Sequence, residues 1–272
     1  MAAGRPSIGS CWEESGRLEN TAEGLLEIAF CEIKKTPQDH TAAGRKEEIM
    51  KIIARIESDF TEKFGIPRQS GIVPELKARI VFEPEYRNPH AVMGLEEYSH
   101  IWILWQFSRA VREEWSPTVL PPRLGGNTHV GVFATRSPFR PNPIGLSCVK
   151  LERVELDPKL GPVLYVAGAD LLNGTPIYDI KPYLAYTDSH PEAVCGFADR
   201  VKDYELQVQF PEELLQKIPE EKREAALGIL RQDPRPSYQK DPKRRYGVAF
   251  AGYDIRFHVK DGVLTVCEVV KY

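Results

Sequence analysis

Four basic residues lie in a segment of the chain that contains no carboxylate side chain. Residues 115–151 lack Asp and Glu, although 39 of the 272 residues of the chain are acidic. Prolines stiffen this segment by fixing φ, and glycines permit close approach of a ligand to the backbone. Arginines that no nearby carboxylate neutralises suit an anion such as a carboxylate, a nucleotide or a phosphate. The alternative is a proline-rich crossover whose arginines pair with distant acids. The basic residues are Arg123, Arg136, Arg140 and Lys150.

Two smaller clusters combine acidic, basic and aromatic side chains. The first reads DLLNGTPIYDIKPY and places Asp170, Asp179, Lys181 and Tyr183 within two turn–strand units. The second, residues 233–238, reads DPRPSY and is followed by several lysines and arginines. A lone basic run is more often a solvated loop than a binding site, so the second cluster by itself indicates little.

Hydrophobic periodicity predicts many short strands separated by Pro and Gly, which favours a barrel or sandwich over a parallel α/β sheet. Helical spacing covers residues 212–231, where Pro219 can start a second helix, and Asp261-Gly262 is typical of a hairpin turn. We expect an appendage over 1–48 with at most one helical stretch over 21–34, a mostly-β domain over 49–200 and an α+β piece over 201–272. The strand candidates are 49–57, 79–82, 100–107, 131–134, 145–156, 163–169, 177–180, 204–210, 248–259 and 263–270.

The net charge of −3 argues against a nucleic-acid binder when only the sum is considered. Residues 1–48, however, hold nine acids and six bases, so the rest of the chain is neutral and can carry a local basic face. Five cysteines without a CxxC pair indicate a reducing, cytoplasmic setting. We expect no membrane span and no secretory signal, since no apolar run approaches about 20 residues.

Several catalytic and binding motifs are missing from the sequence. There is no GxGxxG after a strand, no Walker A loop, no HExxH and no GxSxG. The six histidines lack the spacing of metal ligands, so we expect no metal site. His100 lies beside an apolar run and is more often a core histidine than a base.

Six segments resemble the signature blocks of the TsaA-like family, whose characterised members are tRNA methyltransferase O enzymes. The resemblance covers the chain from about residue 49 to its end, and the blocks keep their order. The block GVFATRSPFRPNPIGLS is long and specific. The others are FGIPRQSG, GLEEYSHIWILWQF, PPRLGG, NGTPIYDIKPY and QDPRPSY.

The resemblance implies a mainly β fold, in which an antiparallel β-barrel binds S-adenosylmethionine (SAM) and a small α+β subdomain follows. It also implies homodimers with the cofactor pocket near the subunit contact, and N6 methylation of N6-threonylcarbamoyladenosine at tRNA position 37. On matching positions, the implied SAM-binding residues are Pro67, Arg68, Gln69, Phe107, Ser108, Arg136, Leu146, Ala167, Gly168, Ala169 and Asp170.

Methyl transfer from a sulfonium depends mainly on positioning and desolvation. Arg136 can bind the SAM carboxylate through two hydrogen bonds, and Asp170 can accept from the ribose or amino group. The acylated N6 must lose its proton, so a carboxylate acceptor is expected. Asp179 is the first candidate, with Lys181 or Tyr183 orienting it or the substrate; alternatively, Asp179 is a structural carboxylate that caps the loop of Lys181. The substrate-binding candidates are Arg123, Arg140, Asp233 and Arg235.

Two other functions stay open at this point. The chain could be a barrel that binds SAM or RNA without catalysis, or a methyltransferase acting on another nucleobase or a small molecule. Affinity for tRNA that falls with salt would favour the tRNA methyltransferase over the small-molecule enzyme.

Overall fold

The computed structural model describes residues 50–109, 114–200, 202–236 and 241–272. The predictions for residues 1–48, including the helical stretch and Cys11 and Cys31, lie outside these residues. None of the helices in the described part of the chain has the length and apolar character of a membrane span.

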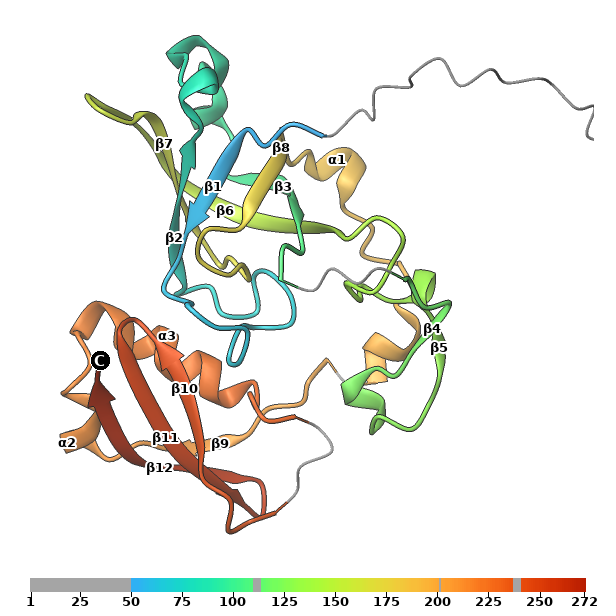
Figure 1. Ribbon diagram of the computed structural model, residues 1–272, viewed down its shortest axis with the longest axis vertical. Helices are drawn as coiled ribbons and strands as arrows, with labels where there is room; N and C mark the ends of the chain where they lie inside the picture. The colour runs from blue at the N-terminus through green and yellow to red at the C-terminus, as the bar shows by residue number, and fades with distance from the viewer. Residues whose placement is uncertain (1–49, 110–113, 201, 237–240) are drawn as a thin grey trace, which may run out of the picture. The chain divides into compact units, whose positions relative to one another are not determined.

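Six antiparallel strands close into a barrel, which confirms the predicted fold class (Figure 1). Each strand pairs with two neighbours, in the circular order β1-β2-β7-β6-β3-β8. Buried aliphatic side chains fill the interior, among them Ile56, Ile80, Ile101 and Leu164. The strands are β1 (Ala54–Glu57), β2 (Lys77–Phe82), β3 (His100–Gln106), β6 (Ile144–Asp157), β7 (Gly161–Ala167) and β8 (Pro176–Pro182).

Strand β3 shows how the sequence positions its side chains. Successive residues of a strand point to opposite faces, and in β3 they alternate between partly buried and buried. Ile101, Ile103 and Trp105 fill the barrel, whereas Trp102 and Leu104 lie on its outer face. The apolar run is continuous because the outer positions of this strand are also partly covered.

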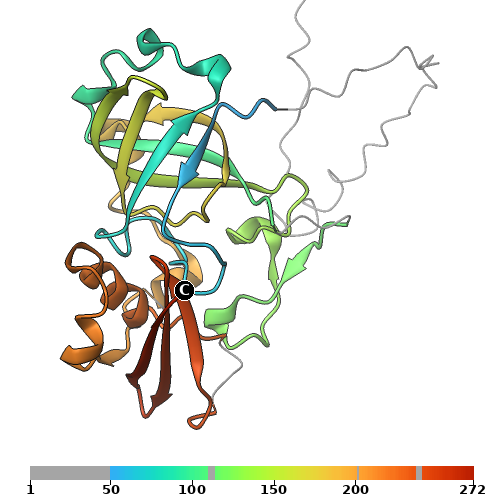
Figure 2. The same ribbon diagram turned by 60° about the vertical axis from the view of Figure 1, so that its left-hand side comes forward.

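The C-terminal part combines a four-stranded sheet with helices (Figure 2). Its core packs against side chains that precede β2, including Phe60 and Val73. A methyl group at Gly228 would lie 2.6 Å from Val73 Cγ1, so the helix approaches this segment closely. The elements are β9 (Gln207–Gln209), α2 (Glu212–Leu215), α3 (Glu220–Arg231), β10 (Tyr246–Phe250), β11 (Tyr253–Lys260) and β12 (Val263–Lys271).

Short elements connect the barrel strands. A separate two-stranded sheet is formed by β4 (Thr118–Val119) and β5 (Val130–Gly131). The short helix α1 (Ala185–Asp188), one turn long, follows β8. The described 3-10 turns are η2 (Pro84–Tyr86), η3 (Pro89–Val92), η4 (Leu95–Glu97), η5 (Pro122–Leu124), η6 (Val132–Ala134) and η7 (Gly196–Arg200).

Several of the predicted elements were wrong in extent or type. The strand expected over 204–210 is only β9 (Gln207–Gln209). The strand expected over 131–134 is mostly the 3-10 turn η6. The run 248–259 is two strands, because Ala251 and Gly252 both adopt positive φ and form a turn. The first strand begins at Ala54 instead of residue 49. The hairpin turn at Asp261-Gly262 is confirmed, with φ of 50° and 79°.

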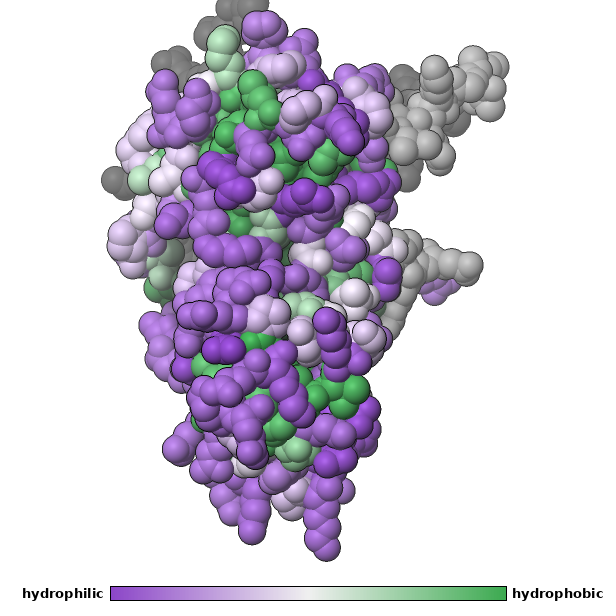
Figure 3. All heavy atoms as spheres, turned by 90° about the vertical axis from the view of Figure 1, so that its left-hand side faces the viewer, coloured by the Kyte–Doolittle hydropathy of each residue, from purple (hydrophilic) through white to green (hydrophobic). Residues whose placement is uncertain are grey.

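Charged side chains of β1 and of β2 and the residue after it neutralise one another. Arg79 pairs with Glu57 at 2.5 Å, and Arg55 pairs with Glu83 at 2.8 Å. The face shown in Figure 3 is mostly hydrophilic, with smaller hydrophobic areas between the polar residues. Exposed ion pairs of this kind contribute little to stability. The arginines of these pairs are neutralised by acids. The arginines of segment 115–151 have no acidic residue within that segment to pair with.

Candidate functional site

A chain of hydrogen bonds fixes Asp170 beside the barrel strands. The indole N–H of Trp105 donates to Ser147 Oγ at 3.0 Å, and the Ser147 hydroxyl donates to Asp170 Oδ1 at 2.6 Å. Ser147 is only 1% exposed. Gly145 makes room for this arrangement, since a methyl group there would lie 2.3 Å from the Trp105 ring. The carboxylate therefore has a fixed position before any ligand arrives.

Burial raises the pKa of Asp170, because a charged carboxylate is less stable away from water. The Ser147 hydrogen bond, the nearby Arg136 charge and the backbone N–H of Ser70 act in the opposite direction and lower this pKa. A partly buried carboxylate with a raised pKa next to a cation is typical of functional sites.

The loop that contains Gln69 ties Arg136 to the same region. The Arg136 guanidinium donates to Gln69 Oε1 at 2.5 Å. Ser70 Oγ accepts from the N–H of Cys148, which follows Ser147 in β6, at 3.1 Å. The Gly71 N–H donates to the carbonyl of Gly168 at 2.8 Å. Residues from four separate segments thus meet around Asp170 and Arg136.

The turn after β7 contributes mainly through its backbone. Ala167 and Ala169 are 3% and 2% exposed, so their methyl groups belong to the core. Gly168 has a φ of 76°, and a methyl group there would lie 3.2 Å from the backbone of Gly71. Of the four predicted SAM-binding residues in this turn, only Asp170 presents a polar side chain, and the other three can meet a ligand only through backbone groups.

Phe107 and Leu146 follow and belong to the neighbouring strands β3 and β6, respectively. Phe107 packs against Trp105 with ring centroids 4.3 Å apart, and its N–H donates to the Pro143 carbonyl at 2.9 Å. Leu146 is exposed on the outer face of β6. Its side chain therefore points away from the inward-facing Ser147 and can pack on the apolar part of a ligand only at the outer face of the barrel. The N–H of Ser108 donates to the Gln106 carbonyl at 2.8 Å, and no side-chain contact ties Ser108 to Asp170.

Asp179 lies on the outer face of the barrel. Lys181 Nζ is 2.8 Å from Asp179 Oδ2, and the N–H of Ile180 donates to Asp179 Oδ1 at 2.9 Å. The hydrogen bond to Asp179 raises the pKa of Lys181. Both side chains are substantially exposed, at 44% and 62%. This contact fits both predictions, an Asp179 oriented by Lys181 and a structural carboxylate, and both stay predictions.

Tyr183 was predicted to orient either Asp179 or the substrate, and its described contacts are with other aromatic rings. Its ring packs against Trp102 and His100, with centroids 5.8 Å and 6.2 Å apart. The Trp102 indole donates to Asp188 at 2.8 Å. The pKa of Asp188 is lowered mainly by the hydrogen bond from the backbone N–H of Leu184 and, to a smaller extent, by the one from this indole. Tyr183 belongs to this aromatic group, and no described contact joins it to Asp179.

A hollow of about 400 Å³ opens beside Asp179. In strand register, Leu104 pairs with both Leu146 and Asp179. This places Leu146 and Asp179 on one face of the barrel, two strand spacings apart, which is about 10 Å. The hollow is lined by Met50, Lys51, Ile53, Tyr86, Leu104, Ile144, Tyr178 and Asp179.

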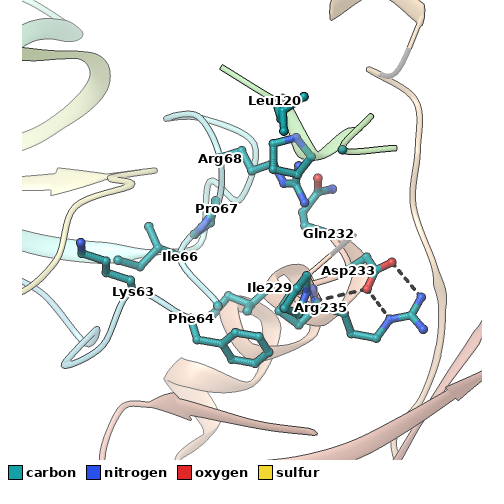
Figure 4. A pocket seen from close by; sticks show the side chains of 15 residues that line it. Lys63, Phe64, Ile66, Pro67, Arg68, Leu120, Ile229, Gln232, Asp233 and Arg235 are labelled. Atoms are coloured by element: carbon teal, nitrogen blue, oxygen red, sulfur yellow. Dashed lines mark hydrogen bonds and ion pairs between the residues drawn. The ribbon is translucent and has the colours of Figure 1, made fainter. Parts of the chain in front are cut away.

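A second pocket, of about 450 Å³, brings together three of the sequence blocks (Figure 4). Arg235 Nε and Nη2 donate to the two carboxylate oxygens of Asp233 at 2.8 Å and 2.9 Å. The Tyr204 hydroxyl donates to the same carboxylate at 2.8 Å. The lining comprises Lys63, Phe64, Gly65, Ile66, Pro67, Arg68, Leu120, Pro122, Gly126, Ile229, Gln232, Asp233, Pro234, Arg235 and Pro236.

The Asp233–Arg235 pair is largely shielded from water. Burial by itself raises the pKa of Asp233, but the hydrogen bonds from Arg235 and Tyr204 outweigh it and leave the pKa below its ordinary value. Asp233 also adopts a φ of 51°, which turns the chain so that Arg235 can reach it. Two of the four substrate-binding candidates, Asp233 and Arg235, therefore line the pocket as one ion pair.

The remaining basic candidates have separate surroundings. Arg140 donates to the carbonyls of Thr135 and Ser137, at 3.1 Å and 3.3 Å, so its guanidinium is held by its own loop. Arg123 lies in η5, one residue after the pocket residue Pro122. Among the described residues, no group of three or more His, Cys, Asp or Glu is arranged to hold a metal ion.

Sequence reasoning missed several residues that support the site. Ser147 and Trp105 hold Asp170, Ser70 holds the Gln69 loop, and Tyr204 holds Asp233. A signal for Ser147 was present, because it is a polar residue at an inward position of a strand whose other inward residues are apolar.

Comparisons with known proteins agree with this organisation. The family model of the tRNA-methyltransferase O N-terminal domain matches residues 55–189, and that of the TrmO C-terminal domain matches residues 203–272. The tRNA (adenine(37)-N6)-methyltransferase of Escherichia coli K12 is 42% identical over 217 residues, covering 77% of this chain and 92% of that protein. The protein of the same name from Eikenella corrodens is 45% identical over 174 residues, covering 64% and 97%.

A solved structure shows the same fold. The crystal structure of TrmO from Pseudomonas aeruginosa superimposes with a TM-score of 0.66 at 35% identity, and the match covers 82% of this chain and 97% of that one. Both family models match in order, and the relatives align over nearly their whole length. On this evidence the chain belongs to the tRNA methyltransferase O family.

Proposed function

We propose that this chain transfers a methyl group from SAM to N6 of N6-threonylcarbamoyladenosine at position 37 of tRNA. Support comes from family membership and from the relatives named tRNA (adenine(37)-N6)-methyltransferase. One observation carries the proposal: Gln69, Arg136 and Asp170 lie far apart in the sequence but come together in the structure. They provide one carboxylate in a fixed position and one cation close to it.

The paired charges at this site fit the amino-acid portion of SAM. Arg136 can bind the α-carboxylate through two parallel hydrogen bonds, and Asp170 can accept from the α-ammonium or from a ribose hydroxyl. Phe107 and Leu146 offer apolar surface to the rest of the molecule. When bound, SAM supplies an electrophilic methyl group on a sulfonium. The chain supplies position and shields the site from water.

Asp179 is the proposed proton acceptor for the acylated N6. It carries its negative charge on an open face, where a substrate can reach it. To accept a proton, its carboxylate exchanges the contact with Lys181 for one with the substrate. Lys181 then stays close enough to hold the carboxylate in place. This role is compatible with the local geometry but requires the acceptor base to enter the hollow beside Asp179.

The carboxylate of the threonylcarbamoyl group needs a cation. We assign this part to the pocket in which Arg235 and Asp233 form a fixed pair, with Arg123 and Arg140 as the other candidates. Arg235 uses two of its five N–H donors on Asp233, and the remaining donors can bind a second anion.

The first experiment is a methylation assay with labelled SAM and two tRNA pools. One pool carries the threonylcarbamoyl group at position 37, and the other lacks it. Label in the modified pool alone is the expected result and would support both the reaction and its acceptor. Label in neither pool, with SAM still bound, would favour a non-catalytic barrel. Label on a small molecule or another base would favour a different methyltransferase.

We further propose that the enzyme acts as a homodimer in the cytoplasm. Asp179 and the Asp233–Arg235 pair line different hollows of one chain, and a second copy could bring them into one site. Light scattering measures the dimer. A mixture of Asp179→Asn and Arg235→Ala chains tests the shared site, because mixed dimers would contain one intact site and regain activity. Two inactive variants that stay inactive after mixing would place both residues in a site of one chain.

A further inference from the structure

Two exposed aromatic rings stack on each other at the base of the β4–β5 sheet. Trp115 precedes β4 and Phe133 follows β5, and their ring centroids are 6.0 Å apart with an interplanar angle of 25°. The pairing of Thr118 with Gly131 and the hydrogen bond from the Val132 N–H to the Pro117 carbonyl bring the two rings together. The short sheet thus fixes the position of the pair.

Both rings remain open to solvent despite their contact. Trp115 is 48% exposed and Phe133 is 71% exposed. The residue between Phe133 and β5, Val132, is 1% exposed and anchors this segment in the interior. Large aromatic side chains are enriched at interfaces, and adjacent exposed rings form an apolar patch on which a partner can pack.

The charge around the rings identifies the kind of partner. The guanidinium carbon of Arg140 lies 6.0 Å from the centroid of the Phe133 ring, and its own loop carbonyls hold it there. Glu114 directly precedes Trp115, whereas residues 115–151, which include Phe133 and Arg140, contain no acidic residue. Exposed aromatic faces combined with an arginine suit unpaired nucleotides, which present both a flat base and a phosphate.

We propose that Trp115 and Phe133 form a stacking platform for an unpaired nucleobase of the tRNA anticodon loop, with Arg140 beside its phosphate. This inference rests on the proposed function. Trp115 and Phe133 lie outside the residues assigned to SAM and to the base at position 37, and Arg140 is given a loop phosphate here in place of the threonylcarbamoyl carboxylate. A second protein copy fits this surface less well. In an isologous contact at the twofold axis, Arg140 of one copy would lie opposite Arg140 of the other.

The test measures the affinity of the full chain for an unmodified anticodon stem-loop RNA by fluorescence anisotropy. Trp115→Ala and Phe133→Ala should each raise Kd by about 5- to 150-fold, the range for loss of one stacked base. Trp115→Phe and Phe133→Tyr keep an aromatic face and should restore most of the affinity. Because no charge is removed, the dependence of Kd on salt should stay the same.

Two controls separate stacking from other causes. Tyr272 is also exposed, at the end of the C-terminal sheet, and Tyr272→Ala should leave Kd unchanged. The second control is a stem-loop that is abasic at all loop positions except 37. The unaltered chain should bind this RNA more weakly than the complete stem-loop. The two alanine variants should bind it as tightly as the unaltered chain does, because no base is left to stack on the platform. Kd values within twofold of one another for all chains would overturn the platform.

Other outcomes are equally decisive. If the alanine variants change the oligomeric state and leave Kd unchanged, the surface joins two copies of the chain and the platform is wrong. If the unaltered chain does not bind the stem-loop but methylates a small molecule, the proposed tRNA function fails. If the variants bind RNA normally while methylation of tRNA persists, only the platform fails.

Discussion

Asp170 and Asp179 belong to one barrel and differ in almost every physical respect. Asp170 is partly buried, receives a hydrogen bond from a serine that is itself held by an indole, and has its pKa raised by burial. Asp179 is exposed, and its partners are a flexible lysine and the N–H of the next residue. One carboxylate has its position determined by the core, and the other can change partners.

This difference indicates different work for the two carboxylates. A ligand that must be held in one orientation is best met by a group that loses no freedom on binding. A proton acceptor, in contrast, must exchange one hydrogen-bonding partner for another during the reaction. We therefore assign orientation of the methyl donor to Asp170 and proton transfer to Asp179, and each prediction below tests one side of the comparison.

The largest effect is expected from Asp179→Asn. General-base catalysis contributes about 10²- to 10⁴-fold, so kcat should fall by at least about 100-fold. The affinity for SAM should stay within about twofold, because Asp179 lies outside the Asp170 cluster. Single-turnover methylation and calorimetric SAM titration measure the two quantities. An unchanged rate would leave Asp179 as a structural partner of Lys181.

The next effect concerns Asp170→Asn, which removes a charged acceptor and keeps the shape. Hydrogen bonds to charged groups contribute about 1.5–3 kcal/mol, so Kd for SAM should rise by about 10- to 150-fold. Calorimetry provides the measurement. Asp157→Asn, in the turn between β6 and β7, is the matched control and should not alter SAM binding. Equal SAM affinity in the two variants would contradict the assignment.

Arg136→Lys, which also alters the cluster around Asp170, should have a smaller effect on SAM affinity. Lysine keeps the charge but loses the planar fork that binds a carboxylate through two hydrogen bonds. We expect Kd for SAM to rise by about 3- to 10-fold, on the order of 1 kcal/mol. Arg140→Lys is the control, since Arg140 is held by the carbonyls of its own loop. That variant should lose thermal stability and retain SAM affinity.

The two aspartates also mark how far sequence reasoning reaches. The alternation in β3 and the turn residues Asp261-Gly262 are local signals, so barrel strands and the last hairpin were predictable. The fixed position of Asp170 depends on Ser147, 23 residues away, and on the space left by Gly145. Such contacts arise only when distant strands pair. The local pattern marks Ser147 as a polar residue at an inward strand position, but it does not show which partner Ser147 has.

The pocket lined by Asp233 and Arg235 also shows what composition alone could not predict. The DPRPSY segment looked like a solvated loop by composition, whereas Asp233 and Arg235 form a shielded ion pair that Tyr204 supports. Only the family resemblance marked these two residues as candidates. Conversely, composition suggested that Arg140 was available to an anion, although its guanidinium is partly occupied by loop carbonyls.

The smallest predicted effect is on the pH dependence of stability. Because the folded-state pKa of Asp170 is raised, folding favours its protonated form. The associated stability is complete below the ordinary Asp pKa of about 3.9 and is lost as pH rises through the raised value. Asp170→Asn lacks this loss, so its Tm relative to that of the unaltered chain should increase as pH rises from about 4. The change should be a few degrees, since 1 kcal/mol alters Tm by about 2–4 °C in a domain of this size.

Asp157 provides a control of opposite sign for the same measurement. The backbone N–H groups of Leu160 and Lys159 lower its pKa, so its contribution is present above the ordinary Asp pKa and is lost as pH falls through the lowered value. The Tm of Asp157→Asn relative to the unaltered chain should therefore decrease as pH rises. The slope with pH is the diagnostic quantity, because each substitution also changes hydrogen bonds in a way that does not depend on pH. Parallel slopes in the two variants would show that burial does not penalise Asp170, and its fixed position would then reflect hydrogen bonding alone.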